Sequence, residues 1–436
     1  MENFVCKGQI FFSTGPNGHR CIPNGFLVCT EGLCQGAFPV LPEAYRDLPL
    51  LDFGDRLILP GLVDLHLHGP QFAYRGLGMD LELLDWLNTH TFPEEAKFRD
   101  LAYAGPAYRQ FVAALQGSFT TRAAIFATAH TEATLLLMDL LEESGLITRV
   151  GRVSMDRDCP EHLREPGPEA ALEETRRWLE AVQGRYRRTG PILTPRFVPT
   201  CSAPLLEGLG RLARETGLPV QSHLSENQKE IAVVQERFPE ASCYAQVYDR
   251  FGLLDTGCIM AHCVHSREAE LALLKERGVF IAHSPESNSN LASGVAPVRR
   301  FLEQGLRVGL ASDVAGGSSL NLFRAMAHAI QASKLRWQLL DQSLPPLTFD
   351  QVFWMATLGG GSFFGPVGTF AQGYAFDALV LDDRRYPTVL PLSIQQRVER
   401  LAYLAEESCL TAKFVSGTSI QIKHWNPEGS HEKMVP

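Results

Sequence analysis

The sequence predicts an α/β protein: a (β/α)₈ barrel, or TIM barrel, with a small β-sandwich domain formed from both ends of the chain. Two observations predict this fold. Apolar runs of strand length alternate with helical segments from about residue 57 to residue 365, and the flanking residues have a different, turn-rich pattern. Strand–helix alternation is typical of parallel sheets, and eight repeats over roughly 300 residues fit a closed barrel.

Eight apolar runs are the predicted barrel strands. They span residues 57–64, 118–128, 146–155, 192–199, 218–223, 257–262, 278–283 and 306–313. A segment that can form a helix follows each run. In residues 266–277, for example, leucines recur at helical spacing with charged residues between them, which is the pattern of a helix with one buried face.

The two flanks predict the smaller domain. Residues 1–56 are rich in Gly, Cys, Phe and Val and contain the turn signal Gly15-Pro16-Asn17-Gly18, and residues 366–383 have the pattern of short strands and turns. We therefore expect a β domain built from 1–56 and 366–436, with 57–365 forming the barrel. Residues 425–436, which are rich in Pro, Gly, Ser and charges, are expected to be a loose tail.

Composition and charge exclude several classes of protein. The 436 residues are 45% hydrophobic and 20% charged, an ordinary globular composition. The net charge of −9 and the absence of a basic run argue against a nucleic-acid polymer or a membrane as partner. The first residues do not resemble a secretory signal. The ten cysteines contain no C-x-x-C pair, so we expect reduced thiols and a cytoplasmic protein.

The strongest local motif is a pair of histidines at the end of the first predicted barrel strand. His66 and His68 are two residues apart in PGLVDLHLH, and residues at this spacing share one face of a strand. Two imidazoles on one face suit a single Zn²⁺ ion. Since H-x-H pairs also occur by chance, this motif alone does not decide the matter.

Three further residues end other predicted strands. His223 ends the fifth, His262 the sixth and Asp313 the eighth. Taken singly, each histidine has an ordinary explanation as a core residue, and the aspartate as a helix N-cap. In a barrel, however, these strand ends cluster on the face that holds active sites. The combination therefore predicts a metal site with one zinc ion per chain.

Glu226 is the candidate proton carrier, because it lies three residues after His223. Zinc lowers the pKa of a bound water to about 7, and the activated water needs a group that accepts and delivers its proton. Without the metal cluster, a glutamate at this position would be explained by its favourable interaction with a helix dipole.

The chain resembles the amidohydrolase superfamily in four motifs and a returning β segment. They are PGLVDLHLH at 60–68, SHLSE at 222–226, AHCVH at 261–265, ASD at 311–313 and GTFAQGYAFDALVLD at 368–382. Within the superfamily it is similar to the guanine deaminases, in HGPQ at 68–71, LLDWLNTHTFPEE at 83–95, PRFVPTCS at 195–202, NLASG at 290–294 and SDVAGG at 312–317.

This resemblance implies hydrolytic deamination of guanine to xanthine and ammonia by a zinc-activated water in a cytoplasmic homodimer. It implies zinc ligation by His66, His68, His223 and Asp313, with His262 counted beside them. It implies Glu226, Asp313 and His262 as catalytic residues: Glu226 moves the water proton to the purine ring, Asp313 helps to protonate the departing amine, and His262 donates to the developing oxyanion. It implies substrate contacts from His68, Gln71, Arg196, Phe197, His223 and Asp313.

Two departures from the guanine deaminase pattern bear on substrate fit. Gly69 replaces the usual alanine of HAPQ, and Glu286 replaces the asparagine of a segment that usually reads CPNSN. We expect the Glu286 carboxylate near the site mouth.

Two alternatives stay open at the level of sequence. The first is the same chemistry on another aminopurine, a pterin, a cytosine-like ring or a chlorinated triazine, which a substrate panel would distinguish. The second is a non-catalytic scaffold with the same fold, which metal content would distinguish. The presence of every expected ligand residue argues against the scaffold.

Overall fold

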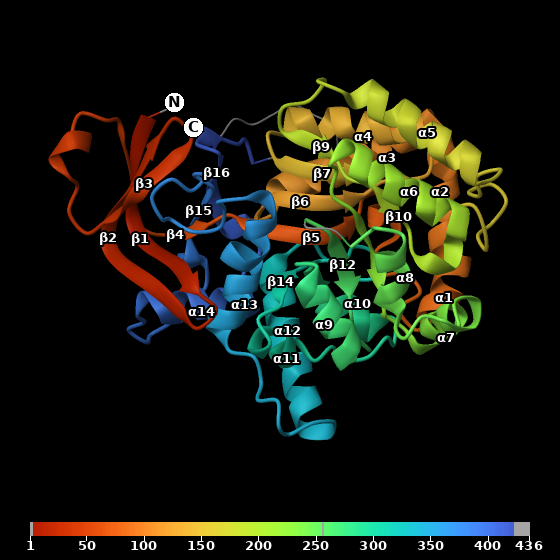
Figure 1. Ribbon diagram of the computed structural model, residues 1–436. Coiled ribbons are helices and arrows are strands. Elements are labelled where there is room, and N and C mark those ends of the chain that lie inside the picture. Colours follow the sequence, from red (N-terminus) through yellow and green to blue (C-terminus); the bar gives the residue numbers. More distant parts are fainter. Residues whose placement is uncertain (1–2, 255–256, 423–436) are drawn as a thin grey trace.

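The computed structural model describes residues 3–254 and 257–422 of the chain. Figure 1 shows strands from both chain ends gathered on one side of the molecule, and parallel strands surrounded by helices on the other. The predicted tail at 425–436 lies outside the described residues.

Both chain ends contribute to one seven-stranded mixed sheet, in the order β17-β16-β15-β4-β1-β2-β3. The strands are β1 (Asn3–Gly15), β2 (Gly18–Thr30), β3 (Leu33–Phe38), β4 (Leu50–Pro60), β15 (Ala378–Leu381), β16 (Leu410–Val415) and β17 (Thr418–Ser419). The predicted turn joins β1 to β2, where Gly15 pairs with Gly18. The expected meeting of the two ends is confirmed, because β15 pairs with β4. The sandwich arrangement itself stays a prediction.

Two four-stranded parallel sheets form the centre of the larger part of the molecule. The first contains β5 (Leu62–His68), β6 (Thr120–Phe126), β7 (Ile147–Gly151) and β9 (Thr189–Pro191), and the second β11 (Gln221–Leu224), β12 (Ile259–His262), β13 (Phe280–His283) and β14 (Arg307–Leu310). A short parallel pair, β8 (Val153–Ser154) and β10 (Thr194–Pro195), accompanies them. Every residue of β5, β6, β12 and β13 is buried, as is typical of strands with helices on one side and a packed core on the other.

Each of the eight predicted apolar runs contains at least part of a strand, but three runs are divided. The run 146–155 contains β7 and β8, which belong to different sheets. The run 57–64 contains the end of β4 and the start of β5, which belong to different sheets. Gly61 lies between them, and a Cβ there would be 2.2 Å from Thr121 Oγ1, so only glycine fits. The run 192–199 contains β10 and then the first two residues of a 3₁₀ turn, Val198–Thr200. Prolines at 195 and 199 lack the N–H that a longer strand requires.

Helices follow the parallel strands and cover them (Figure 1). The longer ones are α3 (Leu101–Gly117), α4 (Thr131–Ser144), α5 (Pro168–Val182), α6 (Ala203–Thr216), α7 (Gln228–Arg237), α9 (Glu268–Glu276) and α12 (Leu322–Leu339). A further helix, α14 (Ile394–Leu404), follows β15 and packs against α12 and β1. The shorter ones include α8 (Tyr244–Arg250), α10 (Pro285–Asn290), α11 (Val298–Glu303) and α13 (Phe349–Trp354). The helix expected in 266–277 is α9. Between β5 and α3 lie α1 (Leu83–Trp86), a π-helical turn (Leu87–Thr91) and α2 (Phe92–Ala96).

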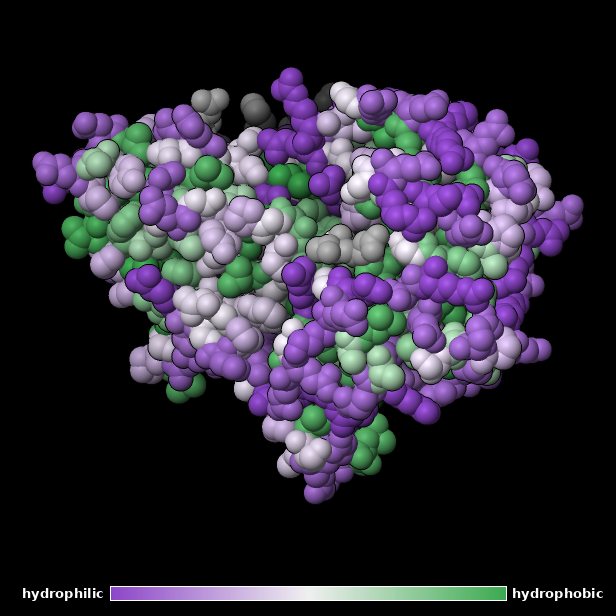
Figure 2. Space-filling model, viewed as in Figure 1, coloured by the Kyte–Doolittle hydropathy of each residue, from purple (hydrophilic) through white to green (hydrophobic). Residues whose placement is uncertain are grey.

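The visible surface is mixed in character. Figure 2 shows hydrophilic side chains over much of this face and an apolar group at the projecting lower tip. Exposed apolar residues near the end of α12 include Leu335, Leu339 and Leu340. Within 3–254 and 257–422, no helix is both long and apolar enough to span a bilayer.

Candidate active site

The five predicted metal ligands come together at the carboxyl ends of the parallel strands. His66 and His68 lie at the end of β5, where the two-residue period directs both imidazoles to one face. His223 lies in β11, His262 is the last residue of β12, and Asp313 follows β14 by three residues. The closest approaches of their side chains lie within hydrogen-bond or ion-pair range. The sequence-based grouping is therefore reproduced in space.

The atoms that could bind a metal face one another. Asp313 Oδ1 lies 3.2 Å from His66 Nε2 and 3.5 Å from His68 Nε2, and Asp313 Oδ2 lies 3.7 Å from His262 Nε2. His68 Nε2 and His223 Nε2 are 3.3 Å apart. Two groups, His66–His68–His223 and His66–His262–Asp313, each have all ligand atoms within 4.8 Å of one another. Both groups share His66, so they describe one cluster.

The outer nitrogens of two of these histidines orient the rings. His223 Nδ1 lies 2.6 Å from the carbonyl oxygen of Arg196, which only accepts, so this nitrogen donates. His262 Nδ1 donates to Asn288 Oδ1 at 2.9 Å. In a neutral imidazole the second nitrogen then carries a lone pair. Both Nε2 lone pairs are consequently presented to the cluster, which is the arrangement that metal-binding histidines need.

Burial sets the protonation of the cluster. It lowers the pKa of His66, His68 and His223 well below the usual histidine value, and positively charged neighbours add to this effect. Burial also raises the pKa of Asp313 to about 6, although His262 opposes the shift. Neutral imidazoles are the form that ligates metals, and a cation in the cluster would favour the ionised carboxylate.

The donor set fits a divalent metal ion. His66 Nε2 and His262 Nε2 are buried and have no hydrogen-bond partner among the described residues. A buried polar atom left without a partner costs about 1–3 kcal/mol. A cation held by imidazole nitrogens and a carboxylate oxygen would satisfy these atoms.

Glu226 lies beside the cluster, as predicted. Its Oε2 is 3.4 Å from His262 Nε2, and its Oε1 accepts a hydrogen bond from Ser293 Oγ at 2.9 Å. Burial raises the pKa of Glu226 to about 8, and the charge of Asp313 contributes. Such a value lies near the pH at which a group exchanging protons with substrate works best.

The backbone at this site is strained in three places. Ser225, His262 and Asp313 have φ values of 47°, 74° and 47°, in the left-handed region that residues other than glycine rarely adopt. Each lies at the point where a strand ends and the chain turns away from the cluster. Strain of this kind costs on the order of 1–3 kcal/mol and is concentrated at functional sites.

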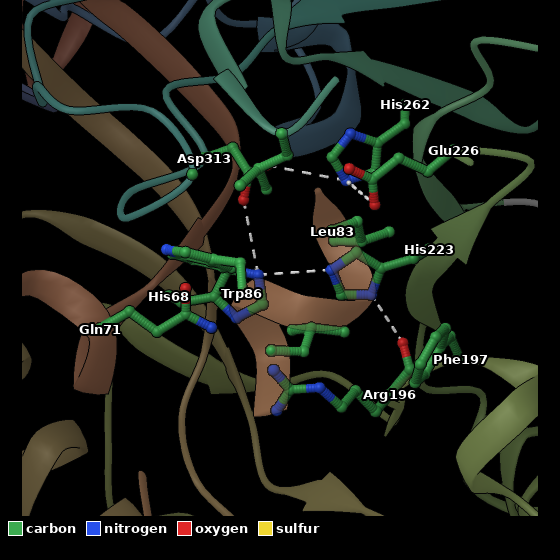
Figure 3. Close-up of a pocket in the computed structure, with 13 residues that line it drawn as sticks. His68, Gln71, Leu83, Trp86, Arg196, Phe197, His223, Glu226, His262 and Asp313 are labelled. Atoms are coloured by element: carbon green, nitrogen blue, oxygen red, sulfur yellow. Dashed lines mark hydrogen bonds and ion pairs between the residues drawn. The ribbon is translucent and has the colours of Figure 1, made fainter. Parts of the chain in front are cut away.

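A concave pocket lined by both apolar and polar side chains opens onto the cluster, as is typical of small-ligand sites. Figure 3 shows Gln71 and Arg196 along one side of it and Glu226 with Asp313 on the other. Its lining residues are His68, Gln71, Leu83, Trp86, Leu87, Arg196, Phe197, His223, Glu226, His262, Leu291, Asp313 and Gly316. The structure therefore brings all predicted site residues to this pocket except His66, which is fully buried behind it.

Sequence reasoning missed several residues that shape the pocket. Leu83, Trp86 and Leu87 line it from the segment between β5 and α3. In the sequence this segment carries only the family resemblance, because no strand end or periodicity marks it. Ser293 and Asn288, which hold Glu226 and His262, were missed for the same reason.

The two departures from the family pattern lie outside the pocket lining. A Cβ at Gly69 would face Leu137 Cδ2 at 3.1 Å, so the residue packs against the helices. The Glu286 carboxylate binds Ser318 Oγ at 2.5 Å and lies 3.6 Å from His328 Nδ1. Its contacts thus involve the start and middle of the α12 region rather than the pocket.

Comparison with known proteins agrees with this geometry. The model of the Amidohydrolase family matches residues 57–420, which is most of the chain. The chain therefore belongs to the amidohydrolase family.

Within that family, the similarity is to guanine deaminases. The chain is 34% identical over 443 residues to the guanine deaminase of Dictyostelium discoideum, a match covering 95% of this chain and 97% of the relative. It is 38% identical over 333 residues to the "Probable guanine deaminase" of Schizosaccharomyces pombe, covering 75% of this chain but only 63% of that protein. The crystal structure of guanine deaminase from C. acetobutylicum with bound guanine superposes with a TM-score of 0.93 at 41% identity, covering 96% of this chain and all of the other.

Proposed function

We propose that this chain is a zinc-dependent guanine deaminase, which hydrolyses guanine to xanthine and ammonia. One observation carries the proposal: the pocket has a histidine–aspartate cluster with Glu226 on one side and the donors of Gln71 and Arg196 on the other. The named relatives supply the substrate, since guanine deaminases match nearly the full chain.

His66, His68, His223, His262 and Asp313 would hold the zinc ion. Imidazole nitrogens with one carboxylate are a donor set typical of catalytic zinc. When bound, zinc supplies an activated water as the nucleophile for C2 of the purine. We assign His262 as a zinc ligand and not as a donor to the oxyanion. Its Nδ1 donates to Asn288, and burial lowers its pKa, so its Nε2 carries a lone pair and no proton.

Glu226 and Asp313 move the protons. Glu226 accepts a proton from the attacking water and delivers it to a ring nitrogen, which limits the charge on the ring as C2 becomes tetrahedral. Ser293 Oγ holds one carboxylate oxygen, so the other remains directed toward the cluster. Asp313 accepts the second proton and passes it to the departing amine.

Arg196 and Gln71 select the base. The Arg196 guanidinium is planar and permanently charged, and it donates to the O6 acceptor of guanine. Adenine carries an amino donor at that position, so it would leave a buried donor without a partner. A mismatch of this type discriminates by roughly 10⁴-fold. Phe197 packs beside the base at the same side of the pocket.

Steady-state rates on guanine, adenine, cytosine, a pterin and a chlorinated triazine test the assignment. We expect efficient ammonia release from guanine and almost none from adenine or cytosine, and Arg196→Ala should reduce this preference more than it reduces zinc content. Equal kcat/KM for guanine and adenine would refute the guanine assignment. Turnover of the pterin or triazine alone would place the same chemistry on another substrate.

We also propose that the two parallel sheets close into the (β/α)₈ barrel expected from the sequence. The barrel would begin after Gly61 rather than at residue 57, because β4 continues to Pro60 in the seven-stranded sheet of the smaller domain. Hydrogen bonds cross both gaps between the sheets, from Gln221 N to Leu193 O and from Asp313 N to His66 O. Family resemblance further favours a cytoplasmic homodimer, which gel filtration and fractionation would test.

A further inference from the structure

The carboxylate of Glu95 lies behind the two side chains proposed to bind the purine. Its Oε1 accepts a hydrogen bond from Gln71 Nε2 at 2.9 Å, and its Oε2 accepts one from Arg196 Nη1 at 2.5 Å. Gln71 follows β5, Arg196 follows β10, and Glu95 lies on α2. Each of the three is at least 98% buried. One carboxylate thus joins three separate parts of the chain without itself lining the pocket.

The remaining contacts fix the direction of both side chains. The Arg196 guanidinium carbon lies 5.1 Å from the ring centroid of Phe92, which is also on α2. Gln71 Oε1 accepts a hydrogen bond from Ala315 N at 3.2 Å, in the loop that carries Asp313. With one amide hydrogen donated to Glu95, Gln71 retains a single N–H to donate to a ligand. Glu95 therefore determines which donors of Gln71 and Arg196 remain for the pocket that both residues line.

Glu95 also sets the charge on this side of the pocket. An arginine without a counter-ion attracts anions, whereas an arginine that shares its charge with a buried carboxylate contributes donors and little net charge. The pair Arg196–Glu95 is such an arrangement, since both side chains are almost completely buried. The pocket consequently suits an uncharged lactam oxygen better than an anion.

We propose that Glu95 is a positioning residue that aligns Gln71 and Arg196 on a neutral 6-oxopurine and, through its charge, keeps the pocket from holding an anionic purine. The inference rests on the proposed function, because the 6-oxopurine is the substrate class assigned there. It adds a consequence for turnover: xanthine, the product, loses a ring proton more readily than hypoxanthine, and its anion is the form that Glu95 disfavours.

Two variants separate alignment from charge. Glu95→Gln keeps the size of the side chain but removes its charge. It also places an amide N–H against one of the two donors that Glu95 accepts from, Gln71 Nε2 or Arg196 Nη1. Glu95→Asp keeps the charge but shortens the reach, so that it cannot contact both partners. Glu94→Gln is the matched control: Glu94 is the neighbouring, mostly buried residue of α2, and its carboxylate binds Lys97 and Tyr103 instead.

The measurements compare inhibitors of guanine turnover that differ only at the polar edge. Hypoxanthine carries the 6-oxygen and purine lacks it, and neither has an amino group to lose. We expect the ratio Ki(purine)/Ki(hypoxanthine) to fall by about 10-fold or more in Glu95→Gln and Glu95→Asp, the worth of one hydrogen bond to a charged group. The KM for guanine should rise while kcat changes little, the result of losing uniform binding. Zinc content should not change.

The effect of the Glu95 charge is measured separately, by the affinity for xanthine relative to hypoxanthine. At mildly alkaline pH, Glu95→Gln should bind xanthine more tightly relative to hypoxanthine than the wild type does, and Glu95→Asp should not. If both variants match the Glu94→Gln control in these ratios while wild type deaminates guanine, the inference is wrong. If wild type does not deaminate guanine, the proposed function fails first. Should Glu95→Gln lose its zinc or its fold, the ratio in Glu95→Asp decides on the alignment, and unchanged values there overturn it.

Discussion

Two buried polar clusters lie at opposite ends of the parallel strands, and they differ in whether their atoms have partners. At the carboxyl ends, His66 Nε2 and His262 Nε2 have no hydrogen-bond partner within the described residues. At the amino ends, Arg122 of β6 binds both carboxylate oxygens of Asp377, with Nε–Oδ2 at 2.7 Å and Nη2–Oδ1 at 3.2 Å. Arg122 also binds Ser416 Oγ at 3.1 Å.

The amino-end cluster continues into the seven-stranded sheet. Lys413 of β16 is fully buried, and its Nζ donates to the carbonyl oxygens of Gln116 at 3.0 Å and Ser118 at 2.9 Å. The comparison shows how a polar cluster that binds a ligand differs from one that only stabilises the fold. A buried polar cluster whose atoms hydrogen-bond to one another joins two parts of the fold. A cluster whose lone pairs point to a common centre but accept no hydrogen bond is suited to bind a ligand.

The largest expected effect is loss of the metal. His66→Ala or Asp313→Ala should remove most of the zinc and nearly all activity, because each change deletes a donor from a small set. Metal content by mass spectrometry and ammonia release are the measurements. Arg122→Met, at the other end of the strands, serves as the control and should keep about one zinc per chain. Full zinc retention in both ligand variants would contradict the assignment of the cluster.

The second-largest effect is expected for Glu226→Gln. It should reduce activity by roughly 10²–10⁴-fold while zinc and fold are retained, because a positioned general acid–base group contributes that factor to the rate. Glu230→Gln is the control. Glu230 is an equally buried carboxylate in the first turn of α7, where it caps the helix, and glutamine also serves in a capping box. A near-normal kcat in Glu226→Gln would assign the proton transfer to another group.

The sequence allowed the carboxyl-end cluster to be predicted but not the amino-end cluster. The five cluster residues lie at or just after the ends of apolar runs: His66, His68, His223, His262 and Asp313. Strand ends in an α/β fold converge, so position in the run predicts position in space. Asp377 and Arg122 are 255 residues apart, and neither has a local pattern. Their pairing depends on how β15 and its neighbours pack against the parallel strands, which no periodicity reports.

The same limit applies to Glu95 and to the division of the run 57–64. Glu95 is 101 residues from Arg196, so its contact is a tertiary event on a short helix. The apolar run looked continuous because both β4 and β5 are buried near Gly61, and burial does not tell which sheet a strand joins. Periodicity in the sequence predicts which residues are buried. Contacts between distant segments can be identified only in the three-dimensional structure.

A smaller effect, on stability alone, is expected at the amino-end cluster. Arg122→Met should destabilise the fold by about 3–5 kcal/mol, because it leaves the buried Asp377 carboxylate without its guanidinium. The kcat of the folded variant should stay within about twofold of wild type, since the change lies away from the reacting atoms. Chemical denaturation and steady-state rates measure the two quantities. A large fall in kcat with unchanged stability would contradict the separation of roles between the clusters.

The smallest expected effect, counted per pH unit, is a change in how stability depends on pH. Burial lowers the pKa of Lys413 from 10.5 to about 7, although Asp377 opposes the shift. Between these values the folded amine is mostly neutral and the unfolded amine is protonated, so the unfolded state binds about one more proton. The free energy of unfolding should therefore gain up to about 1.4 kcal/mol per pH unit from this residue as pH rises through that window.

Lys413→Met should remove this contribution. Lys7→Met, in β1 of the same sheet, replaces a partly exposed lysine and should leave the slope unaltered. Denaturation midpoints from pH 7 to pH 10 compare the three proteins, and since the buried thiols titrate alike in all of them, the differences isolate the amine. Parallel profiles for wild type and Lys413→Met would show that Lys413 stays charged in the fold, and the amino-end cluster would then hold a second buried cation beside Arg122.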